Sequence, residues 1–349
     1  MKKFLFLAIA AAAMTSCSQD EVLEVAQKQA IQFGESFVGN ATRAIDPSHV
    51  VTDIDEFYVY GTLTGKGTNA NRVDLYKGAK VERNGAQNGK AFTCNQTEYW
   101  TPDATYAFAA VAHATSVTCT SGLPSSIDFE YTDGTVDLLY TKTLNSVTTD
   151  GSATPTGGVN NEKIVNFTFD HLLSKLQFKF LNEAQDNAHI FKVKDIQISG
   201  LPANGTYTVG NSEPWTTTGT TSNAVSFGDA SDATETTAEA TEILKTNTTG
   251  ITSDKALLVI PNKNTLTITF VKELYYDVDD DNIADDTELI YSDANLTGDK
   301  KYTEITLSNQ TFAANGNYVL VVKLTSGGKI EFTVEALNDW TEEATVNVN

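Results

Sequence analysis

The amino-acid sequence predicts an all-β protein. Thr, Asn, Gly, Val and Tyr are abundant, whereas long helical patterns with a charged face are missing. Many short segments alternate between apolar and polar side chains, which is the pattern of a strand with one buried face. Turn-forming residues separate these segments at short intervals, and such spacing is typical of β-sandwiches and partly open barrels. A chain of 349 residues is long enough for two domains of ordinary size.

The N-terminus is predicted to be an export signal of residues 1–16. Two lysines precede an apolar run, Phe4–Ala13, that is too short to span a bilayer as a mature helix. Small residues then lead to Cys17 in the sequence MTSC, which resembles the lipobox of bacterial lipoproteins apart from Met14 in place of the usual leucine. This resemblance implies a lipid on Cys17 and attachment to the outer membrane of a Gram-negative cell. The alternative is an ordinary secretory signal followed by an unmodified cysteine.

Residues 17–43 form a predicted pro-segment or tether that contains a strand. Apolar residues stand at odd positions and polar residues mostly at even ones, as in a strand with one buried face. The apolar residues of this pattern are Leu23, Val25, Ile31, Phe33 and Phe37. The segment ends at a lone arginine, Arg43. Because the strand lies between a membrane anchor and a candidate protease site, we predict that it is removable.

Predicted strands follow along the first half of the chain. They are Ile54–Leu63, Thr105–Val111, Ile127–Tyr131, Leu138–Tyr140, Val165–Phe169 and Leu172–Phe180. In the last of these, apolar residues alternate with Lys175, Gln177 and Lys179. We therefore expect this strand to have one face in a core and a basic face in solvent.

The second half of the chain continues in the same style. Its predicted strands are Phe191–Ile198, Ala256–Ile260, Leu266–Phe270, Tyr318–Val322 and Ile330–Ala336. In the first of these, apolar residues change from odd to even positions near Lys194 and Asp195, which predicts a β-bulge. The segment Tyr318–Val322 is apolar on both faces and is predicted to be central. We place the domain boundary between an N-terminal domain of residues 44–170 and a C-terminal domain of residues 171–349.

Composition and motif content exclude several functions. With 45 acidic and 24 basic residues the net charge is −21, which disfavours nucleic acid and anionic lipid as partners. The 4 histidines share no metal-ligand spacing, and no nucleophile motif, glycine-rich phosphate loop or catalytic carboxylate pair stands out. We therefore predict that the protein is not an enzyme and has no cofactor apart from the calcium candidate below. Cys94 and Cys119 leave two alternatives open, a disulfide or two buried free thiols.

Several short strings from residue 137 onward follow one another in an order that matches a known family. They are Asp137–Tyr140, Val165–Leu176, Ile198–Leu201, Gly205–Tyr207 with Trp215, Leu258–Pro261, Gly316–Tyr318 and Trp340. With the lipobox and Arg43 at the other end, they resemble the fimbrillin-like (type V pilin) family. The resemblance implies two transthyretin-like β-sandwich domains in tandem, and a fimbrial (pilus) subunit or accessory adhesin at the cell surface. It also implies an arginine-specific protease that cuts between Arg43 and Ala44.

Assembly is predicted from the two ends of the chain. Near the C-terminus, Ala344, Val346 and Val348 alternate with polar residues, as the N-terminal strand does. We predict that the N-terminal strand fills a groove in its own first domain and that cleavage at Arg43 frees it. The C-terminal strand of another pilin subunit then adds in by donor-strand exchange. The alternative is that Arg43 lies in a flexible tether and that residues 344–349 complete the protein's own sheet.

Two other functions stay open at this stage. One is a monomeric, surface-exposed lipoprotein that binds a glycan on a host or bacterial surface, for which exposed aromatic platforms would be diagnostic. The other is a surface enzyme, which needs a polar cluster in a pocket. We interpret His171 as a structural histidine at a strand start. We interpret Trp100, Trp215 and Trp340 as core or domain-edge residues.

One acidic segment resembles a calcium-binding loop. Acids stand at positions 1, 3, 5, 9 and 12 of a twelve-residue stretch, as in an EF-hand; they are Asp277, Asp279, Asp281, Asp285 and Glu288. Asn282 stands where that loop has glycine, and the flanking segments look like strands. The alternative is a solvated acidic hairpin tip.

Overall fold

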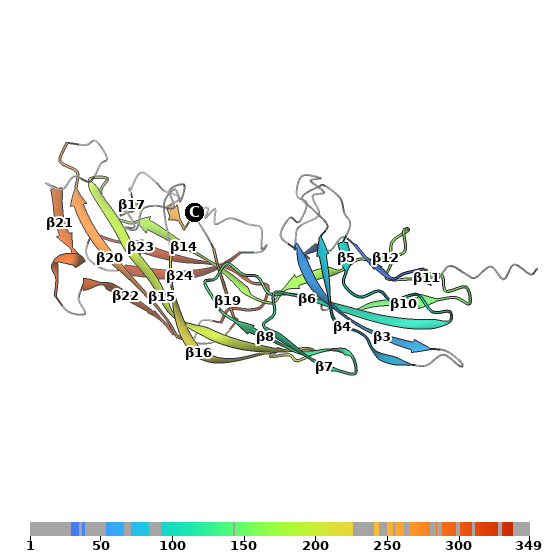
Figure 1. The fold of residues 1–349 in the computed structure, drawn as a ribbon. Helices are drawn as coiled ribbons and strands as arrows, with labels where there is room; N and C mark the ends of the chain where they lie inside the picture. The colour runs from blue at the N-terminus through green and yellow to red at the C-terminus, as the bar shows by residue number, and fades with distance from the viewer. Residues whose placement is uncertain are drawn as a thin grey trace, which may run out of the picture.

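A computed structural model gives the fold (Figure 1). It describes residues 29–34, 37–38, 54–65, 71–83, 92–141, 144–225, 241–243, 250–253, 256–261, 265–279, 284, 288–297, 301–308, 311–326 and 330–337. Within these residues the protein consists of β-strands, loops and short 3-10 turns such as Asp293–Asn295, so the all-β prediction is confirmed. The described part of the chain contains no helix long and apolar enough to cross a membrane.

The N-terminal half forms one large sheet. Its strand order is β2-β13-β9-β6-β3-β4-β5, with β10 paired to β6 and β11 paired to β10. The bounds are β2 (Phe37–Val38), β3 (Glu56–Gly65), β4 (Arg72–Arg83), β5 (Phe92–Cys94), β6 (Ala104–Ala112), β9 (Leu139–Tyr140), β10 (Asn145–Thr149), β11 (Pro155–Thr156) and β13 (Thr168–His171). Beside it, β1 (Gln32–Phe33) and β12 (Ile164–Val165) form a separate two-stranded parallel sheet.

The rest of the described chain forms two further sheets. One has the order β18-β14-β23-β24, with β19 also paired to β14; the other has the order β21-β20-β15-β8-β7, with β16 and β17 on β15 and β22 on β20. The bounds are β7 (Ser116–Thr120), β8 (Leu123–Glu130), β14 (Ser174–Asn182), β15 (His189–Thr208), β16 (Trp215–Ala224), β17 (Thr241–Ile243), β18 (Ile251–Thr252), β19 (Leu257–Val259), β20 (Leu266–Tyr276), β21 (Leu289–Ser292), β22 (Thr303–Leu307), β23 (Asn317–Leu324) and β24 (Ile330–Leu337).

Two large hydrophobic cores meet at the N-terminal sheet. Successive residues of a strand point to opposite faces. On β6, Phe108 and Ala110 therefore belong to the N-terminal core, whereas Ala109 and Val111 belong to the larger core shared with the C-terminal sheets. The hairpin β7–β8 joins a C-terminal sheet, because β8 pairs with β15. The tandem arrangement of two separate domains therefore stays a prediction.

The predicted basic outer face of the strand at Leu172–Phe180 is wrong. In β14, Lys179 is only 1% exposed and Gln177 is 8% exposed. The strand is central, because β23 pairs with one edge and β18 and β19 pair with the other. On the second face of this strand, Leu181 of β14 packs with the buried aliphatic side chain of Val319 on β23. Burial lowers the pKa of the Lys179 ammonium from its ordinary value, and Glu335 opposes that shift.

Three other details of the sequence are settled by the structure. The register of β15 against β20 shifts between Lys194 and Gln197, where Asp195 has a φ of 53°, so the predicted bulge is confirmed. Strand β23 is buried on both faces and central, as its apolar sequence predicts. Cys94 in β5 and Cys119 in β7 are both free thiols, as in the second alternative, but they are half-buried and not fully buried. Burial raises the pKa of both thiols.

Candidate functional site

The N-terminal strand is seated between two backbone edges of the N-terminal half. On one side Ile31 N donates to Glu98 O at 2.8 Å, and Trp100 N donates to Gln29 O at 3.0 Å. On the other side β1 runs parallel to β12, and Gly34 N donates to Val165 O at 3.0 Å. Further along the chain, β2 runs parallel to β13. The predicted strand is confirmed at residues 29–34 and 37–38, and residues 29–34 form backbone hydrogen bonds along both edges.

The buried face of this strand matches the predicted alternation. Ile31 and Phe33 are 4% and 3% exposed and belong to the N-terminal core, whereas Gln32 between them is exposed. The Phe33 ring lies 5.2 Å from Tyr76, 5.8 Å from Phe108 and 5.9 Å from Phe167, measured between ring centroids. Burying a phenylalanine side chain stabilises by about 1.5–3 kcal/mol, and favourable ring pairs add to this. These three rings, which we call the aromatic box, make Phe33 the main anchor of the strand.

An ion pair fixes the backbone edge at Glu98, on one side of the N-terminal strand. Arg72 on β4 donates to both carboxylate oxygens of Glu98, at 2.6 and 2.8 Å, and Gln96 donates to the same carboxylate at 3.1 Å. Glu98 also supplies the carbonyl that receives Ile31 N. The hydrogen bonds from Arg72 lower the pKa of Glu98 from its ordinary value, and burial opposes this shift. The guanidinium therefore positions the backbone that holds the N-terminal strand.

Replacing Arg72 by glutamine is expected to lower the free energy of unfolding at pH 7 by about 1 kcal/mol or less, because the pair is partly exposed. Since Glu98 has a lowered pKa in the folded chain, its contribution is complete above the ordinary value of 4.5 and is lost as the pH falls through the folded value. Thermal unfolding should show a larger loss of melting temperature at pH 7 than at pH 3, because protonation of Glu98 weakens the pair as the pH falls. Lys301→Gln, at an exposed lysine, is the control. An equal deficit at both pH values would contradict this assignment.

Gly34 lies at the tightest point of the site that holds residues 29–34. A Cβ at this position would lie 2.5 Å from Ile164 Cγ2 and 2.7 Å from Asn166 Oδ1. Both distances are shorter than real Cβ contacts, so a side chain fits here only if the side chains of Ile164 and Asn166 shift. Positions 31 to 34 of the strand thus hold an aliphatic residue, an exposed polar residue, an aromatic residue and a glycine, in that order.

The residues predicted to act in export and assembly lie outside the described part of the chain. They are Cys17, Arg43, Ala44, Ala344, Val346 and Val348. Leu23 and Val25 of the predicted strand also lie outside it, and for Phe37 only the backbone in β2 is described. The sequence reasoning found the strand but missed the aromatic box and Glu98, because these come from distant segments that carry no motif.

The acidic segment lies at the end of β20 and the start of β21, so its flanks are strands as predicted. Carboxylate oxygens of Asp277, Asp279 and Glu288 lie within 4.8 Å of one another, a spacing that one calcium ion with oxygen ligands at about 2.3–2.6 Å can bridge. Val278 N already donates to Glu288 Oε1 at 2.7 Å. Asp281 and Asp285 lie outside the described residues. Calcium binding therefore stays a prediction, and the spacing of these three carboxylates is compatible with it.

If the three carboxylates bind calcium, millimolar calcium should raise the melting temperature by mass action on the folded chain. Magnesium should have a smaller effect, because it demands octahedral geometry and retains its water ligands. Asp277→Asn combined with Glu288→Gln should abolish the calcium effect. Differential scanning calorimetry with and without chelator measures both. An unchanged melting temperature at millimolar calcium would leave an acidic hairpin tip.

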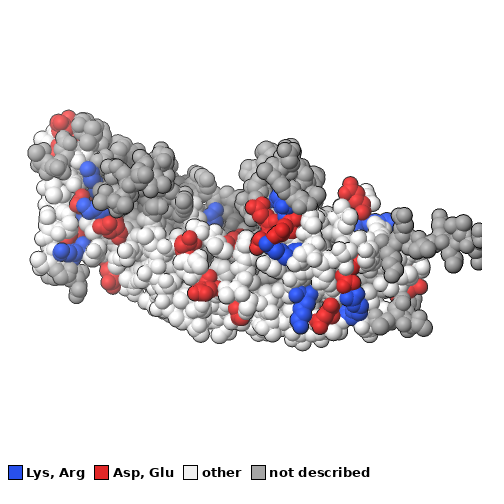
Figure 2. Space-filling model, in the orientation of Figure 1, with Lys and Arg blue, Asp and Glu red and all other residues white. Residues whose placement is uncertain are grey.

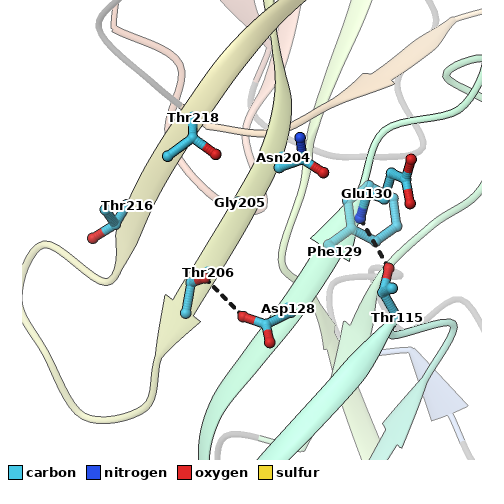
Figure 3. Close-up of a pocket in the computed structure, with 9 residues that line it drawn as sticks. All are labelled: Thr115, Asp128, Phe129, Glu130, Asn204, Gly205, Thr206, Thr216 and Thr218. Carbon is cyan, nitrogen blue, oxygen red and sulfur yellow. Dashed lines mark hydrogen bonds between the residues drawn. The ribbon is translucent and has the colours of Figure 1, made fainter.

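A second feature is a shallow polar pocket of about 260 Å³ on the sheet formed by β8, β15 and β16 (Figure 3). The lining residues are Thr115, Asp128, Phe129, Glu130, Asn204, Gly205, Thr206, Thr216 and Thr218. Asp128 accepts hydrogen bonds from Ser116 and Thr206 at 2.6 and 2.7 Å, which lower its pKa. No basic side chain lines the pocket, so its chemistry suits a neutral hydroxyl-rich ligand better than an anion.

His171 and two of the tryptophans have structural roles. His171 is buried at the end of β13, and its Nδ1 donates to Asp137 Oδ2 at 2.5 Å. Trp100 is buried in the N-terminal core, and Trp215 donates from its indole to Leu172 O at 3.1 Å. The structural roles are confirmed, but the predicted place of His171 at a strand start is wrong because His171 is the last residue of β13. Trp340 lies outside the described residues. Exposed aromatic side chains do occur elsewhere in the described chain, including Tyr276 and Tyr302.

The chain is similar to several solved structures. A crystal structure of a fimbrial protein from Bacteroides vulgatus matches with a TM-score of 0.56 and 12% identity, over 90% of this chain and 100% of that one. A candidate cell adhesion protein from Bacteroides eggerthii matches with a TM-score of 0.46 and 12% identity, over 90% and 96% of the two chains. The tip fimbrial protein Mfa3 from Porphyromonas gingivalis, with a C-terminal truncation, matches with a TM-score of 0.41 and 10% identity, over 90% and 100%. No curated protein sequence matches the chain.

The fold and the seated N-terminal strand define an all-β protein that shares its fold with a fimbrial protein. A model of the fimbrillin-like family matches residues 42–340, most of the chain. The protein therefore belongs to the fimbrillin-like family, as its motifs predict.

Proposed function

We propose that this chain is a subunit of a cell-surface fimbria, exported as a lipoprotein on Cys17 and matured by removal of its N-terminal strand. The proposal rests on the site that holds residues 29–34, which we call the seat. Removal of these residues would leave an unpaired backbone edge on each side of the seat and expose the aromatic box. The family match begins at residue 42 and so leaves this strand out. Unpaired strand edges above an apolar groove are a template for another strand.

The arginines support Arg43 as the cleavage point. The sequence has three, Arg43, Arg72 and Arg83. Arg72 and Arg83 lie in β4, where Arg72 pairs with Glu98, and Arg83 donates to Ile54 O at 3.1 Å. A protease needs an extended, accessible backbone, which a residue inside a paired strand does not offer. An arginine-specific protease should therefore prefer Arg43 in the folded chain.

Removal of the strand opens the groove to a strand from a neighbouring subunit. A contact of this kind, repeated head to tail, does not close and so builds a fibre. Ala344, Val346 and Val348 are the donor residues that the sequence pattern predicts. On the face that Figure 2 shows, acidic and basic side chains lie next to one another over the N-terminal half.

Treatment of the full chain with an arginine-specific protease is expected to give laddered, heat-resistant multimers, because strand addition replaces the lost backbone bonds. Mass spectrometry should locate the cut between Arg43 and Ala44. Arg43→Ala is expected to stay uncut and monomeric, and deletion of residues 341–349 tests the predicted donor. A wild-type chain that remains monomeric after complete cleavage would contradict assembly by exchange.

Glycan binding by a monomeric surface lipoprotein is the second candidate function. It is favoured by the polar pocket on β8, β15 and β16, whose threonine hydroxyls, Asn204 amide and carboxylates can hydrogen-bond a sugar. Binding to a neutral glycan that is lost on Asn204→Ala would support this function over assembly.

A further inference from the structure

The polar pocket on β8, β15 and β16 has a regular layout that follows from strand pairing. Two rows of three paired residues cross these strands, and all six side chains point to one face because directly paired residues share a face. From β8 through β15 to β16, the rows are Glu130, Asn204 and Thr218, then Asp128, Thr206 and Thr216. Strands lie about 4.8 Å apart and alternate residues about 6.8 Å apart, so the six side chains cover an area of about 10 by 7 Å. One sugar ring with its substituents can cover such an area.

The two sides of this pocket differ in chemistry. Figure 3 shows the carboxylates of Asp128 and Glu130 along β8 and the hydroxyls of Thr216 and Thr218 along β16, with the residues of β15 between them. A ligand that spans the pocket therefore meets negative charge on one side and neutral hydroxyl groups on the other.

The backbone under the pocket is held firmly from the opposite face of the sheet. Gly205 lies between the two rows on β15, and a Cβ there would lie 2.7 Å from the Trp215 ring and 2.9 Å from Ile260 Cγ2. Trp215 is fixed in turn, because its indole donates to Leu172 O at 3.1 Å. The polar side chains thus project from paired strands whose other face packs on the larger core. A site on such elements holds its geometry better than a site on loops.

The two carboxylates of the pocket have no basic partner within the described residues. Asp128 accepts one hydrogen bond on each oxygen, from Ser116 and Thr206, which holds the pKa of Asp128 below its ordinary value and leaves each oxygen one further acceptor position. In the described chain the carboxylate of Glu130 takes part in no hydrogen bond or ion pair, and no lysine or arginine lines the pocket. Carboxylates elsewhere do have such partners, as Glu98 has in Arg72.

Two carboxylates at this spacing suit a positively charged nitrogen. An ammonium group has three donors, and its bonds to carboxylates are about 2.7–2.9 Å long. Because alternate residues of a strand lie about 6.8 Å apart, one ammonium between Asp128 and Glu130 can donate to both. A neutral sugar would bond to the amide and the hydroxyls but would leave both carboxylates without a counter-charge.

We propose that the pocket binds an amino sugar of a glycan whose amine is not acetylated. The ammonium lies between Asp128 and Glu130, and the hydroxyls of the ring bond to Asn204, Thr216 and Thr218. This inference names the class of glycan for the second candidate function, on which it rests. It does not depend on strand exchange, because the seat belongs to the N-terminal core and the pocket lies on a C-terminal sheet.

Isothermal titration calorimetry with the full chain tests the proposal at pH 6, at which the amine of an amino sugar is protonated. The probes are the β-1,4-linked trisaccharides of glucosamine, N-acetylglucosamine and glucose, which differ only in the substituent at carbon 2. Spermidine is a further probe, an amine without a sugar ring. The glucosamine trisaccharide is expected to bind at least about fivefold more tightly than the other two at low salt. Its advantage should shrink at high salt, because screening weakens exposed charge pairs.

Glu130→Gln is the main variant, because it removes a charge from a side chain whose carboxylate bonds to nothing in the described chain. It is expected to weaken binding of the glucosamine trisaccharide by about threefold to tenfold and to leave the two neutral trisaccharides nearly unchanged. Asn204→Ala should weaken all three trisaccharides. Glu162→Gln, at an exposed carboxylate outside the pocket, is the control and should change none of them.

Equal or tighter binding of a neutral trisaccharide would overturn the amino-sugar assignment while leaving glycan binding intact. Spermidine that binds as tightly as the glucosamine trisaccharide would also overturn it, since the pocket would then select the amine and not the ring. Binding that Glu130→Gln leaves unchanged would do the same, because the amine would then lie elsewhere. If no trisaccharide binds, glycan binding itself fails, whereas assembly is tested separately by cleavage at Arg43.

Discussion

A chain with Phe33→Ala is expected to lose about 3–5 kcal/mol of stability in its N-terminal core, the usual cost of removing a buried phenylalanine. The ring is 3% exposed and touches three other aromatic residues, Tyr76, Phe108 and Phe167. Because the strand is joined to the rest of the described core by short backbone ladders, losing this anchor should also release the strand. We expect a lower melting temperature and faster proteolysis of the segment before Arg43.

The neighbouring Gln32 supplies a matched control. It lies on the same strand with its side chain exposed, so Gln32→Ala should change stability by less than about 0.5 kcal/mol. Phe33→Leu should fall between the two, since it keeps apolar volume but loses the ring contacts. Thermal unfolding and limited proteolysis of the four proteins measure the effect. Equal stability of the Phe33→Ala and Gln32→Ala proteins would show that the strand is not anchored by its aromatic residue.

The N-terminal strand was predictable because its signal is local. A half-buried strand shows its buried residues at every second position, and Ile31 and Phe33 follow this rule. The β15 bulge was predictable for the same reason, because a one-residue slip reverses the faces on either side of Lys194 and Gln197. Both features can be inferred from a few consecutive residues without knowing what packs against them.

The surroundings of the strand could not be predicted in this way. Tyr76, Phe108 and Phe167 form the aromatic box only after β4, β6 and the segment before β13 come together. Lys179 also shows that a local sequence pattern does not determine burial. Its alternation with apolar residues indicates a solvent-facing position, yet β14 is central and buries it. Alternation records the chemistry of one strand, whereas burial depends on its neighbours in the sheet.

The hairpin β7–β8 escaped sequence reasoning for a related reason. Its residues precede the predicted boundary, but pairing of β8 with β15 places them in a C-terminal sheet. Gly122, at the hairpin turn, has a φ of 83° and passes so close to Val73 O on β4 that a Cβ would lie 1.4 Å away. The hairpin thus contacts both the N-terminal sheet and a C-terminal sheet, and no local pattern in the sequence predicts such a long-range contact.

Replacement of Gly34 by valine is expected to expel the N-terminal strand without any cut at Arg43. A Cβ would lie 2.5 Å from Ile164 and 2.7 Å from Asn166, and valine adds two methyl groups in the same space. The N–H bond from residue 34 to Val165 O at 3.0 Å holds the strand at this point, so either the Ile164 and Asn166 side chains must shift or this bond is lost. Overpacking of this kind costs about 1–3 kcal/mol or more, a large part of what seats a short strand.

Gly151→Val is the matched control, because the nearest atom to a Cβ at Gly151 is Asp103 Oδ2 at 3.8 Å. Hydrogen exchange should show loss of protection at Ile31 and Trp100 in the Gly34→Val chain and full protection in the control. The uncut variant should also accept a synthetic peptide of residues 30–36, which the uncut wild type should exclude because its own strand fills the groove. Retained protection at Ile31 in the Gly34→Val chain would mean that the β12 segment yields more easily than the strand, and the groove would then be less selective at this position.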